Sequence, residues 1–403
     1  MTSPLTAIPC AALLLLVPPL TTAPPAGEGG ADWPNWRGPD RDGISKESGW
    51  NVEGKKASVW EKNVGSGYST VSIQGGRLYT MGHDEEKQQD TIWCLDAKTG
   101  AQKWAHTLPA KTMKSGHGGG TLSTPSADGE VVFASNREGN FFCFEAATGK
   151  IRWHKQLRDE YELKLPRWGF AAAPLVFDDM VVMNVGVVLA FDKKGELLWK
   201  TARSYGDAYS TPAELRLNGR SVLAVFAGDG LVLVDRARGE ELAFHPWTTM
   251  YDINAATPVV AGERVFISSG YNHGCAMLAP TSKGLEVLWE SKEMRNQMSG
   301  CVLFDGHLYG VDDATLKCLD LDGEVKWAQR GLGKGCLLLA GGRLLVMSDK
   351  GELVIASASP AGYEELSRRK VLDGGVCWTT PVLLDGLVYC RNSEGDLVCL
   401  DHR

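Results

Sequence analysis

One phrase returns along the whole chain of 403 residues and constrains its fold more than any other feature. It joins an apolar stretch to an acidic residue and a glycine turn, and it reaches a tryptophan four residues after the glycine. The copies read CLDAKTGAQKW at 94–104, CFEAATGKIRW at 143–153, AFDKKGELLW at 190–199 and CLDLDGEVKW at 318–327, and the chain ends inside another, CLDHR at 399–403. A recurrence of this kind, with a mean period of about 43 residues, is typical of a solenoid or a propeller.

Each repeat divides into four short strands joined by hairpins. In the unit at 120–157, Asp128-Gly129 marks the first turn and Thr148-Gly149 the last, because glycine supplies the positive φ that such turns need. Four strands in about 40–50 residues is the spacing of a propeller blade. First-turn pairs recur at 75–76, 128–129, 178–179, 218–219, 261–262, 305–306, 341–342 and 385–386. The sequence therefore predicts an all-β fold, an eight-bladed β-propeller of four-stranded antiparallel blades.

The two ends of the repeat array predict how the ring closes. The last unit, 377–403, breaks off after its third strand, whereas SVWEKNV at 58–64 looks like a fourth strand that belongs to no neighbouring unit. We expect this N-terminal strand to complete the last blade, since closure leaves no open sheet edge. Seven blades is the alternative if the unit at 335–370, which lacks the tryptophan, is degenerate.

Tryptophan and cysteine hold fixed places in the repeat, and both are expected to be structural. Each phrase tryptophan should dock between adjacent blades and donate its indole N–H to a neighbouring blade's backbone. A cysteine at one equivalent position should point into a different blade interface in each unit, as a small buried hydrophobe. A disulfide between Cys301 and Cys336, on neighbouring inner strands, is the alternative for those two. The cysteines that share the phrase position are Cys94, Cys143, Cys318 and Cys399.

The N-terminus carries a separate signal. Residues 7–20 are mostly apolar but too short to span a bilayer, and small residues and prolines follow them. This pattern predicts a signal peptide at 1–26, an N-terminal extension at 27–57 and the propeller at 58–403. The mature chain is therefore expected in the periplasm or outside the cell, without a transmembrane segment. The formal net charge of -7 and the dispersed Lys and Arg residues argue against a nucleic-acid partner.

The D-x-x-T-G-x-x-x-W form of the phrase resembles the repeat of the quinoprotein alcohol dehydrogenase-like propellers. That superfamily contains dehydrogenases that depend on pyrroloquinoline quinone (PQQ), and non-enzymatic scaffolds such as the lipoprotein of the outer-membrane β-barrel assembly machine. The segment DWPNWRGPDRDGIS at 32–45 is similar to the opening of secreted bacterial PQQ-repeat-like proteins. For the dehydrogenases, the resemblance implies a vicinal cysteine pair and a calcium ion bridged by Glu, Asn and Asp. This chain has no Cys-Cys pair and no motif that places the ion's ligands.

Common catalytic motifs are absent from the sequence, including the P-loop, H-E-x-x-H, the EF-hand loop and the G-x-S-x-G elbow. His83 and His273 fall in hairpins between second and third strands and are expected to be solvent-exposed. The loops that enter the innermost strands should open onto one mouth of the central channel, where aromatic, amide and charged groups could bind a ligand. These ligand-binding candidates are Tyr68, His117, Arg167, Trp168, Tyr209, Asp252, Asn254, Gln297, Lys334 and Trp378.

The regular repeat without an inserted catalytic apparatus favours a secreted, non-catalytic propeller scaffold. We expect it to bind an envelope protein, a peptide or a small ligand at the channel mouth or the loop face, with no metal and no cofactor. The alternative is a PQQ-dependent oxidoreductase of the alcohol or sugar dehydrogenase type, which the superfamily resemblance implies. In that case Trp168 or Trp378 would form a stacking floor for the cofactor, with calcium beside it.

Overall fold

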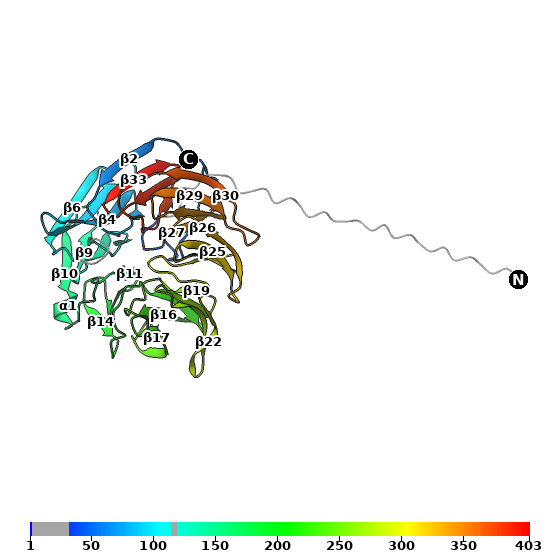
Figure 1. Ribbon diagram of the computed structural model, residues 1–403. Coiled ribbons are helices and arrows are strands. Elements are labelled where there is room, and N and C mark those ends of the chain that lie inside the picture. The colour runs from blue at the N-terminus through cyan, green and yellow to red at the C-terminus, as the bar shows by residue number, and fades with distance from the viewer. Residues whose placement is uncertain (2–31, 114–118) are drawn as a thin grey trace.

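The computed structural model is a ring of eight β-sheets around a central channel (Figure 1), and it describes Met1 and residues 32–113 and 119–403. Each blade has four antiparallel strands from the channel to the rim, and one blade carries an added parallel strand, so the predicted eight-bladed propeller is confirmed. The seventh blade is complete although its outer strand lacks the docking tryptophan, so the seven-blade alternative is wrong. The predicted signal peptide at 1–26 lies almost wholly outside the described residues.

The first four blades follow the chain without interruption. A single helical turn, α1 (Leu157–Glu160), follows blade 2. The strands, from inner to outer, are β3 (Ser72–Gln74), β4 (Arg77–Asp84), β5 (Gln89–Asp96) and β6 (Gln102–Pro109) in blade 1, β7 (Ser126–Asp128), β8 (Val131–Ser135), β9 (Asn140–Glu145) and β10 (Ile151–Gln156) in blade 2, β11 (Leu175–Val176), β12 (Val181–Val185), β13 (Val187–Phe191) and β14 (Leu197–Lys200) in blade 3, and β15 (Ala213–Leu217), β16 (Arg220–Ala227), β17 (Gly230–Asp235) and β18 (Glu241–Pro246) in blade 4.

The last four blades repeat this order, with one strand added to blade 7 and one supplied to blade 8 from the N-terminal side. The short β1 (Ile44–Ser45) joins the inner strand of blade 7 in parallel. The strands are β19 (Val259–Ala261), β20 (Arg264–Ser269), β21 (Gly274–Thr281) and β22 (Gly284–Ser291) in blade 5, β23 (Val302–Phe304), β24 (His307–Asp312), β25 (Thr315–Asp320) and β26 (Val325–Arg330) in blade 6, β27 (Cys336–Ala340), β28 (Arg343–Met347), β29 (Glu352–Ser357) and β30 (Glu365–Lys370) in blade 7, and β31 (Val382–Leu384), β32 (Leu387–Arg391), β33 (Asp396–Asp401) and β2 (Ser58–Asn63) in blade 8.

The repeated phrase is explained by the contact between neighbouring blades. Trp104, on the outer strand of blade 1, donates its indole N–H to the carbonyl of Ala146 in blade 2, at 3.0 Å. A Cβ on Gly149, in the last turn of blade 2, would lie only 2.6 Å from that indole ring, and the glycine has a φ of 74°. Glycine is therefore required twice, once by the turn and once by the ring packed against it. The same bond to the next blade is made by Trp60, Trp153, Trp289 and Trp327. Trp199 packs on Gly239 of the next blade, but its indole N–H has no partner among the described residues, so the predicted bond is wrong for this copy.

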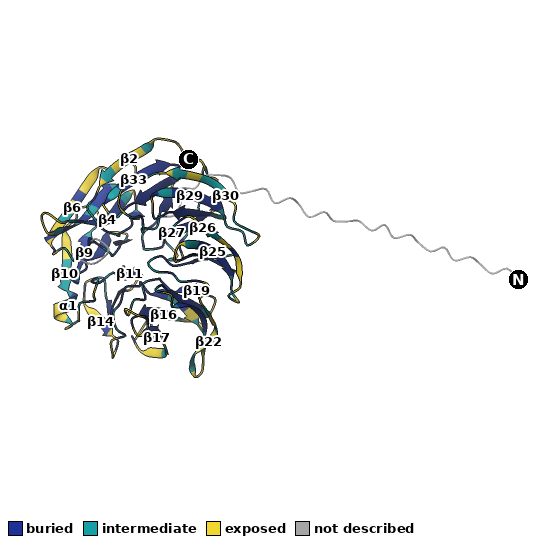
Figure 2. Cartoon of the chain, viewed as in Figure 1, coloured by how far each residue is buried: buried dark blue, intermediate teal, exposed yellow. Residues whose placement is uncertain are grey.

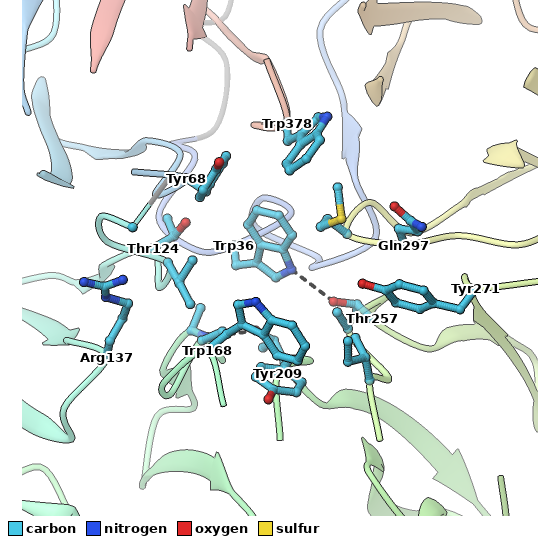
Figure 3. Close-up of a pocket in the computed structure, with 18 residues that line it drawn as sticks. Trp36, Tyr68, Thr124, Arg137, Trp168, Tyr209, Thr257, Tyr271, Gln297 and Trp378 are labelled. Atoms are coloured by element: carbon cyan, nitrogen blue, oxygen red, sulfur yellow. Dashed lines mark hydrogen bonds between the residues drawn. The ribbon is translucent and has the colours of Figure 1, made fainter. Parts of the chain in front are cut away.

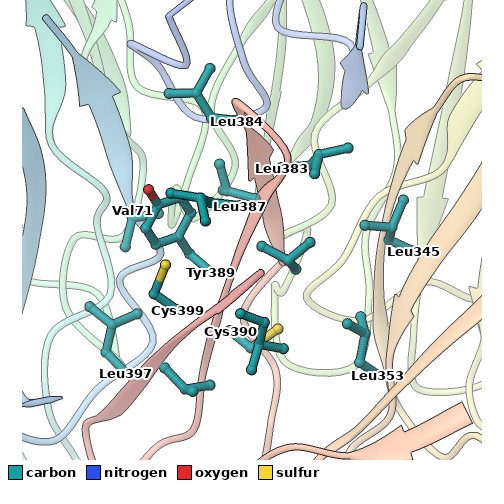
Figure 4. Close-up of a cluster of buried hydrophobic side chains, with 14 of the residues drawn as sticks. Val71, Leu345, Leu353, Leu383, Leu384, Leu387, Tyr389, Cys390, Leu397 and Cys399 are labelled. Carbon is teal, nitrogen blue, oxygen red and sulfur yellow. The ribbon is translucent and has the colours of Figure 1, made fainter. Parts of the chain in front are cut away.

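The hydrophobic core consists of layers between the blades, because both faces of each sheet are covered by a neighbour. Figure 2 shows buried inner strands and exposed outer strands around the whole ring. Figure 4 shows the layers on the two sides of blade 8, with Tyr389 and Cys399 beside Val71 of blade 1 and Leu383 on the side of Leu345 of blade 7. The cysteines that the structure describes are all buried and free, so the predicted role of the phrase cysteines is confirmed and the Cys301–Cys336 bridge is not formed.

The ring closes through β2, as the truncated last repeat predicts. β2 pairs antiparallel with β33, and Trp60 lies opposite Cys399, the register that Trp104 and Cys94 have in blade 1. Blade 8 also sends the fully buried guanidinium of Arg391 into blade 1, where it donates to the Met81 carbonyl at 2.8 Å. The first and last blades are therefore joined by pairing, packing and hydrogen bonds.

Candidate functional site

The described part of the N-terminal extension, residues 32–57 and here called the strap, covers one mouth of the channel. It begins at blade 1, where the Trp33 carbonyl accepts from Ile73 N–H at 2.7 Å, and continues to blade 2, where the Pro34 carbonyl accepts from Ala127 N–H at 2.8 Å. Its further contacts reach blades 3, 5, 6, 7 and 8 through Arg41, Trp36, Arg37, β1 and Glu47.

Arg37 holds the middle of the strap. Its guanidinium is buried and donates to the carbonyl of Cys301 in blade 6 and to that of Asp42 in the strap itself, each at 2.7 Å. Burial lowers the pKa of Arg37, but its hydrogen bonds to carbonyl oxygens satisfy the charge. Trp33 and Trp50 of the strap belong to the core between blades 7, 8 and 1. The strap is therefore part of the folded ring, and this mouth is closed.

The opposite mouth opens into a cavity of about 180 Å³, lined by the loops that enter the inner strands. Figure 3 shows Trp36 rising from the strap into the middle of this ring of side chains. The indole N–H of Trp36 donates to the hydroxyl of Thr257 at 3.0 Å. The channel is therefore a blind pocket whose floor includes a residue of the strap. Its aromatic lining residues are Trp36, Tyr68, Trp168, Tyr209, Tyr271 and Trp378.

The aromatic side chains that line the pocket contact one another and a neighbouring arginine. Tyr68 stacks on Trp378 with ring centroids 5.7 Å apart, which bridges blades 1 and 8. Trp168 meets Tyr209 edge-to-face at 5.9 Å, and the exposed guanidinium of Arg167 lies 5.1 Å from the Trp168 ring. Such pairs fix ring orientation in the absence of a ligand. The pocket is thus preformed.

Most polar atoms of the lining already have partners inside the protein. The Tyr209 hydroxyl donates to Asp207 at 3.2 Å, and the Gln297 side-chain oxygen accepts from Lys334 at 3.0 Å. Burial raises the pKa of Tyr209, and the neighbouring carboxylate of Asp207 raises it further. The Tyr271 hydroxyl makes no hydrogen bond to any residue that the structure describes, and Figure 3 shows it directed toward the ring of side chains. With the indole N–H of Trp168, it is one of the polar groups of the lining that have no hydrogen-bond partner among the described residues.

The predicted mouth residues divide into four groups. Five of them line the pocket, namely Tyr68, Trp168, Tyr209, Gln297 and Trp378. Arg167 and Asp252 are exposed beside it, and Lys334 lies behind Gln297, bound to it and to Asp313. Asn254 is fully buried and structural, since it donates to the carbonyls of Ala227 and Trp247. His117 lies outside the described residues.

Sequence reasoning missed several lining residues, above all Trp36, Arg137 and Tyr271. The sequence places Trp36 only in an N-terminal extension, although two tryptophans in a segment without a strand pattern are a signal of burial. Tyr271 lies in a hairpin between second and third strands, which we did not expect at the mouth. Arg137 is also buried, and desolvation lowers its pKa.

The expectation that His83 is solvent-exposed is wrong. The ring is buried, with Nδ1 2.8 Å from an Asp90 carboxylate oxygen and Nε2 2.8 Å from the Thr112 hydroxyl. The segment after β6 folds back over this hairpin and covers the histidine. His273 is half-buried against Trp247, with ring centroids 4.5 Å apart.

Comparison with known proteins agrees with this architecture. A family model described as outer membrane protein assembly factor BamB matches residues 88–329, about three fifths of the chain. This chain belongs to that family. The outer membrane protein assembly factor BamB of Yersinia pestis is 22% identical over 352 residues, which cover 84% of this chain and 77% of the relative. The predicted resemblance to PQQ-repeat propellers is thereby confirmed.

Solved structures show how widely this BamB-type fold is shared. The crystal structure of BamB from Moraxella catarrhalis has a TM-score of 0.61 at 16% identity and covers 85% of this chain and 100% of its own. A quinohemoprotein alcohol dehydrogenase from Comamonas testosteroni has a TM-score of 0.52 at 14% identity, over 92% of this chain and 80% of its own. At these identities the likeness shows the fold alone. Among the described residues of this family member, we find no helix with the length and apolar character that a membrane crossing requires.

The dehydrogenase neighbours make PQQ with calcium the cofactor to test against this pocket. PQQ carries three carboxylates, and calcium takes oxygen ligands, mostly carboxylates and carbonyls. No carboxylate is among the described lining residues, and the one cation there, Arg137, is buried with its Nη2 3.4 Å from the Lys111 carbonyl. Nowhere in the described chain do three His, Cys, Asp or Glu side chains gather in a way that could hold a metal ion. The residues present do not fit this cofactor.

Proposed function

We propose that this protein is a non-catalytic scaffold of the cell envelope that binds a partner protein or peptide at its open mouth and needs no cofactor. The observation that carries the proposal is the blind aromatic pocket, which has rigid walls but no group placed for acid–base or metal chemistry in its described lining. Membership of the BamB family supports a partner that belongs to an envelope assembly.

The rim of the mouth has the composition of an interaction surface. Met250 and Tyr251, in the loop before β19, are 75% and 44% exposed, and Arg167 lies 5.9 Å from the Tyr251 ring. Aromatic residues, Met and Arg are enriched in protein interfaces, and this rim presents all three types together. The partner is therefore expected to contact the open mouth and not the strap.

Site-specific photocrosslinking in the source cells tests this orientation. A photoreactive amino acid replaces the exposed Arg167 at the open mouth or, as the matched control, the exposed Lys98 in the β5–β6 turn on the strap face. We expect one envelope protein to be captured at Arg167 and not at Lys98. Equal capture at both positions, or capture at Lys98 alone, would contradict the proposal.

A second arm tests the oxidoreductase that the quinoprotein neighbours suggest. The purified full chain is mixed with PQQ and calcium and offered alcohols and sugars together with an artificial electron acceptor. We expect no dye reduction above the level of PQQ and calcium alone, because the pocket offers no carboxylate to hold the ion. Turnover that depends on the protein would replace the scaffold proposal with the enzyme.

A further inference from the structure

The polar atoms of the pocket lining are mostly hydrogen-bonded within the protein, and this disfavours polar ligands. A bound sugar or polycarboxylate must exchange its water hydrogen bonds for protein ones, or pay the desolvation of each unpaired group. Here the Thr211 hydroxyl accepts from Ala173 N–H at 2.9 Å, and the Thr124 hydroxyl accepts from Thr70 N–H at 3.1 Å. With Tyr209 and Gln297 also engaged, the lining offers few polar atoms to a polar ligand.

Aromatic surface is what the pocket does offer. The rings come from the strap and from blades 1, 3, 4, 5 and 8, and Tyr68, Trp168, Tyr271 and Trp378 remain only half-buried. Ring edges and faces in this state gain free energy when another ring covers them, about 0.5–1.5 kcal/mol per pair beyond the area buried. The uncommitted Tyr271 hydroxyl adds one hydrogen-bonding partner among these rings.

The molecule itself shows that this channel accepts an aromatic side chain from a non-repeating segment. Trp36 stands on a turn of the strap, enters the channel from the closed side and donates one hydrogen bond, to Thr257. The open side presents the same kind of walls to solvent. Tyr251 lies 5.2 Å from Tyr271 and extends the aromatic surface from the pocket to the rim.

We propose that the open-mouth pocket binds one aromatic side chain, carried by a flexible segment of a partner protein, with the flanking backbone of that segment lying on Met250 and Tyr251. This inference rests on the proposed scaffold function and names the chemistry that the scaffold recognises. Tyr271 would donate or accept a hydrogen bond at the polar edge of a bound Trp or Tyr, which gives these two an advantage over Phe.

Peptide selection on the full-length protein tests the inference. A phage-displayed library of random 12-residue peptides is panned against it, and each selected peptide is remade with its aromatic residue replaced by Ala. We expect the selected peptides to share one aromatic residue, and its replacement to weaken binding about thirtyfold or more, the loss typical of a hot-spot side chain.

Two pocket variants and one control locate the bound side chain. Ala255 lines the pocket and is half-buried, so Ala255→Leu fills part of the cavity, whereas Lys98→Leu adds the same side chain on the strap face. We expect Ala255→Leu to weaken the selected peptides at least about tenfold and Lys98→Leu to leave them unchanged. Tyr271→Phe keeps the ring and removes only the hydroxyl, so it should weaken Trp and Tyr peptides severalfold and spare Phe peptides.

The outcomes separate this inference from the function beneath it. Selected peptides without a shared aromatic residue, or binding that survives both pocket variants, would overturn the aromatic-anchor inference. If crosslinking at Arg167 still captured a partner in that case, the scaffold function would stand. Failure to select any peptide counts against the aromatic-anchor inference. If crosslinking at Arg167 also captured no protein, both that inference and the scaffold function would be overturned.

Discussion

The two mouths of the channel are built from the same repeats and end in opposite states. At the strap face, the first turns and inner strands of the blades hydrogen-bond a non-repeating segment, the strap, whose Arg37 is buried and donates to blade 6. At the open face, the loops before the inner strands bond to one another and leave half-buried rings around a cavity. The difference teaches that a non-repeating segment, the strap, closes one mouth of this channel, whereas the loops that join the blades leave the other mouth open.

The largest difference in stability is expected between the replacement of a tryptophan at the strap face and that of a tryptophan at the open mouth. Trp33 of the strap is 2% exposed and belongs to the core of blades 7, 8 and 1, so Trp33→Ala should destabilise the protein by about 3–5 kcal/mol. Trp168 of the open mouth is half-buried, so Trp168→Ala should cost only about 1 kcal/mol. Chemical denaturation followed by far-UV circular dichroism measures both. Equal losses would mean that the strap is no more integral to the fold than the pocket wall.

A smaller effect on stability is expected from the buried charge of Arg37 in the strap. Arg37→Met removes the hydrogen bonds to the Asp42 and Cys301 carbonyls and leaves the buried Cys301 carbonyl unpaired, which should cost about 2–3 kcal/mol. Lys46→Met, the control, removes an exposed ion pair with Asp40 in the same strap and should leave the stability nearly unchanged. The shift in denaturation midpoint distinguishes them. A neutral Arg37→Met would show that the other contacts of the strap hold it without this guanidinium.

Much of this architecture could be predicted from the repeat, because each of its positions has one physical task. Each contact between blades occurs once per repeat, so the residues that make it recur as well: the glycine of the last turn, the docking tryptophan and the cysteine opposite it. Trp60 could therefore be assigned to the last blade from its neighbours in sequence. The strap could not be placed in this way. It makes single contacts to many blades, and a contact that occurs once leaves no period in the sequence.

The candidate site was predictable in location and only partly in membership. Loops before inner strands must reach one mouth, which placed Tyr68, Trp168 and Trp378 correctly. Which side chain of a loop turns inward depends on its local bonds, and for that reason Asn254 was misjudged, since it serves the loop backbone instead. His83 failed in a similar way, because the segment that covers it arrives from the far end of β6.

A pH effect is expected at the strap face. His402 lies at the end of blade 8 with Nδ1 2.7 Å from the Asn51 carbonyl, its Nε2 has no partner among the described residues, and burial lowers its pKa. The unfolded histidine, with a pKa near 6.5, takes up a proton before the folded one. Stability should therefore be constant above about pH 7.5 and fall as the pH drops below about 6.5.

Thermal unfolding of the wild type and of His402→Gln between pH 7.5 and 5 measures this contribution. The variant should lose part of the pH dependence, because other half-buried histidines, such as His106 and His245, have pKa values lowered by burial as well. If the unfolding temperature changed with pH equally in the two proteins, protonation of His402 would not destabilise the strap face. Peptide binding at the open mouth should not follow this profile, since neither carboxylate nor histidine is among its described lining residues.

The smallest effect is expected for the alkylation of buried cysteine thiols, which should hardly react if the pocket is preformed. Cys377 directly precedes Trp378 at the open mouth, Cys94 lies in a blade interface, and burial raises the pKa of both to about 12. Alkylation by iodoacetamide at pH 8 should leave both unmodified for hours, because reaction needs an accessible thiolate. Peptide mapping by mass spectrometry reads each site, and the denatured protein provides the fully labelled control. Modification of Cys377 alone would show that the open mouth loosens locally while the blades stay packed, and the rigid walls on which aromatic recognition depends would then have to form on binding.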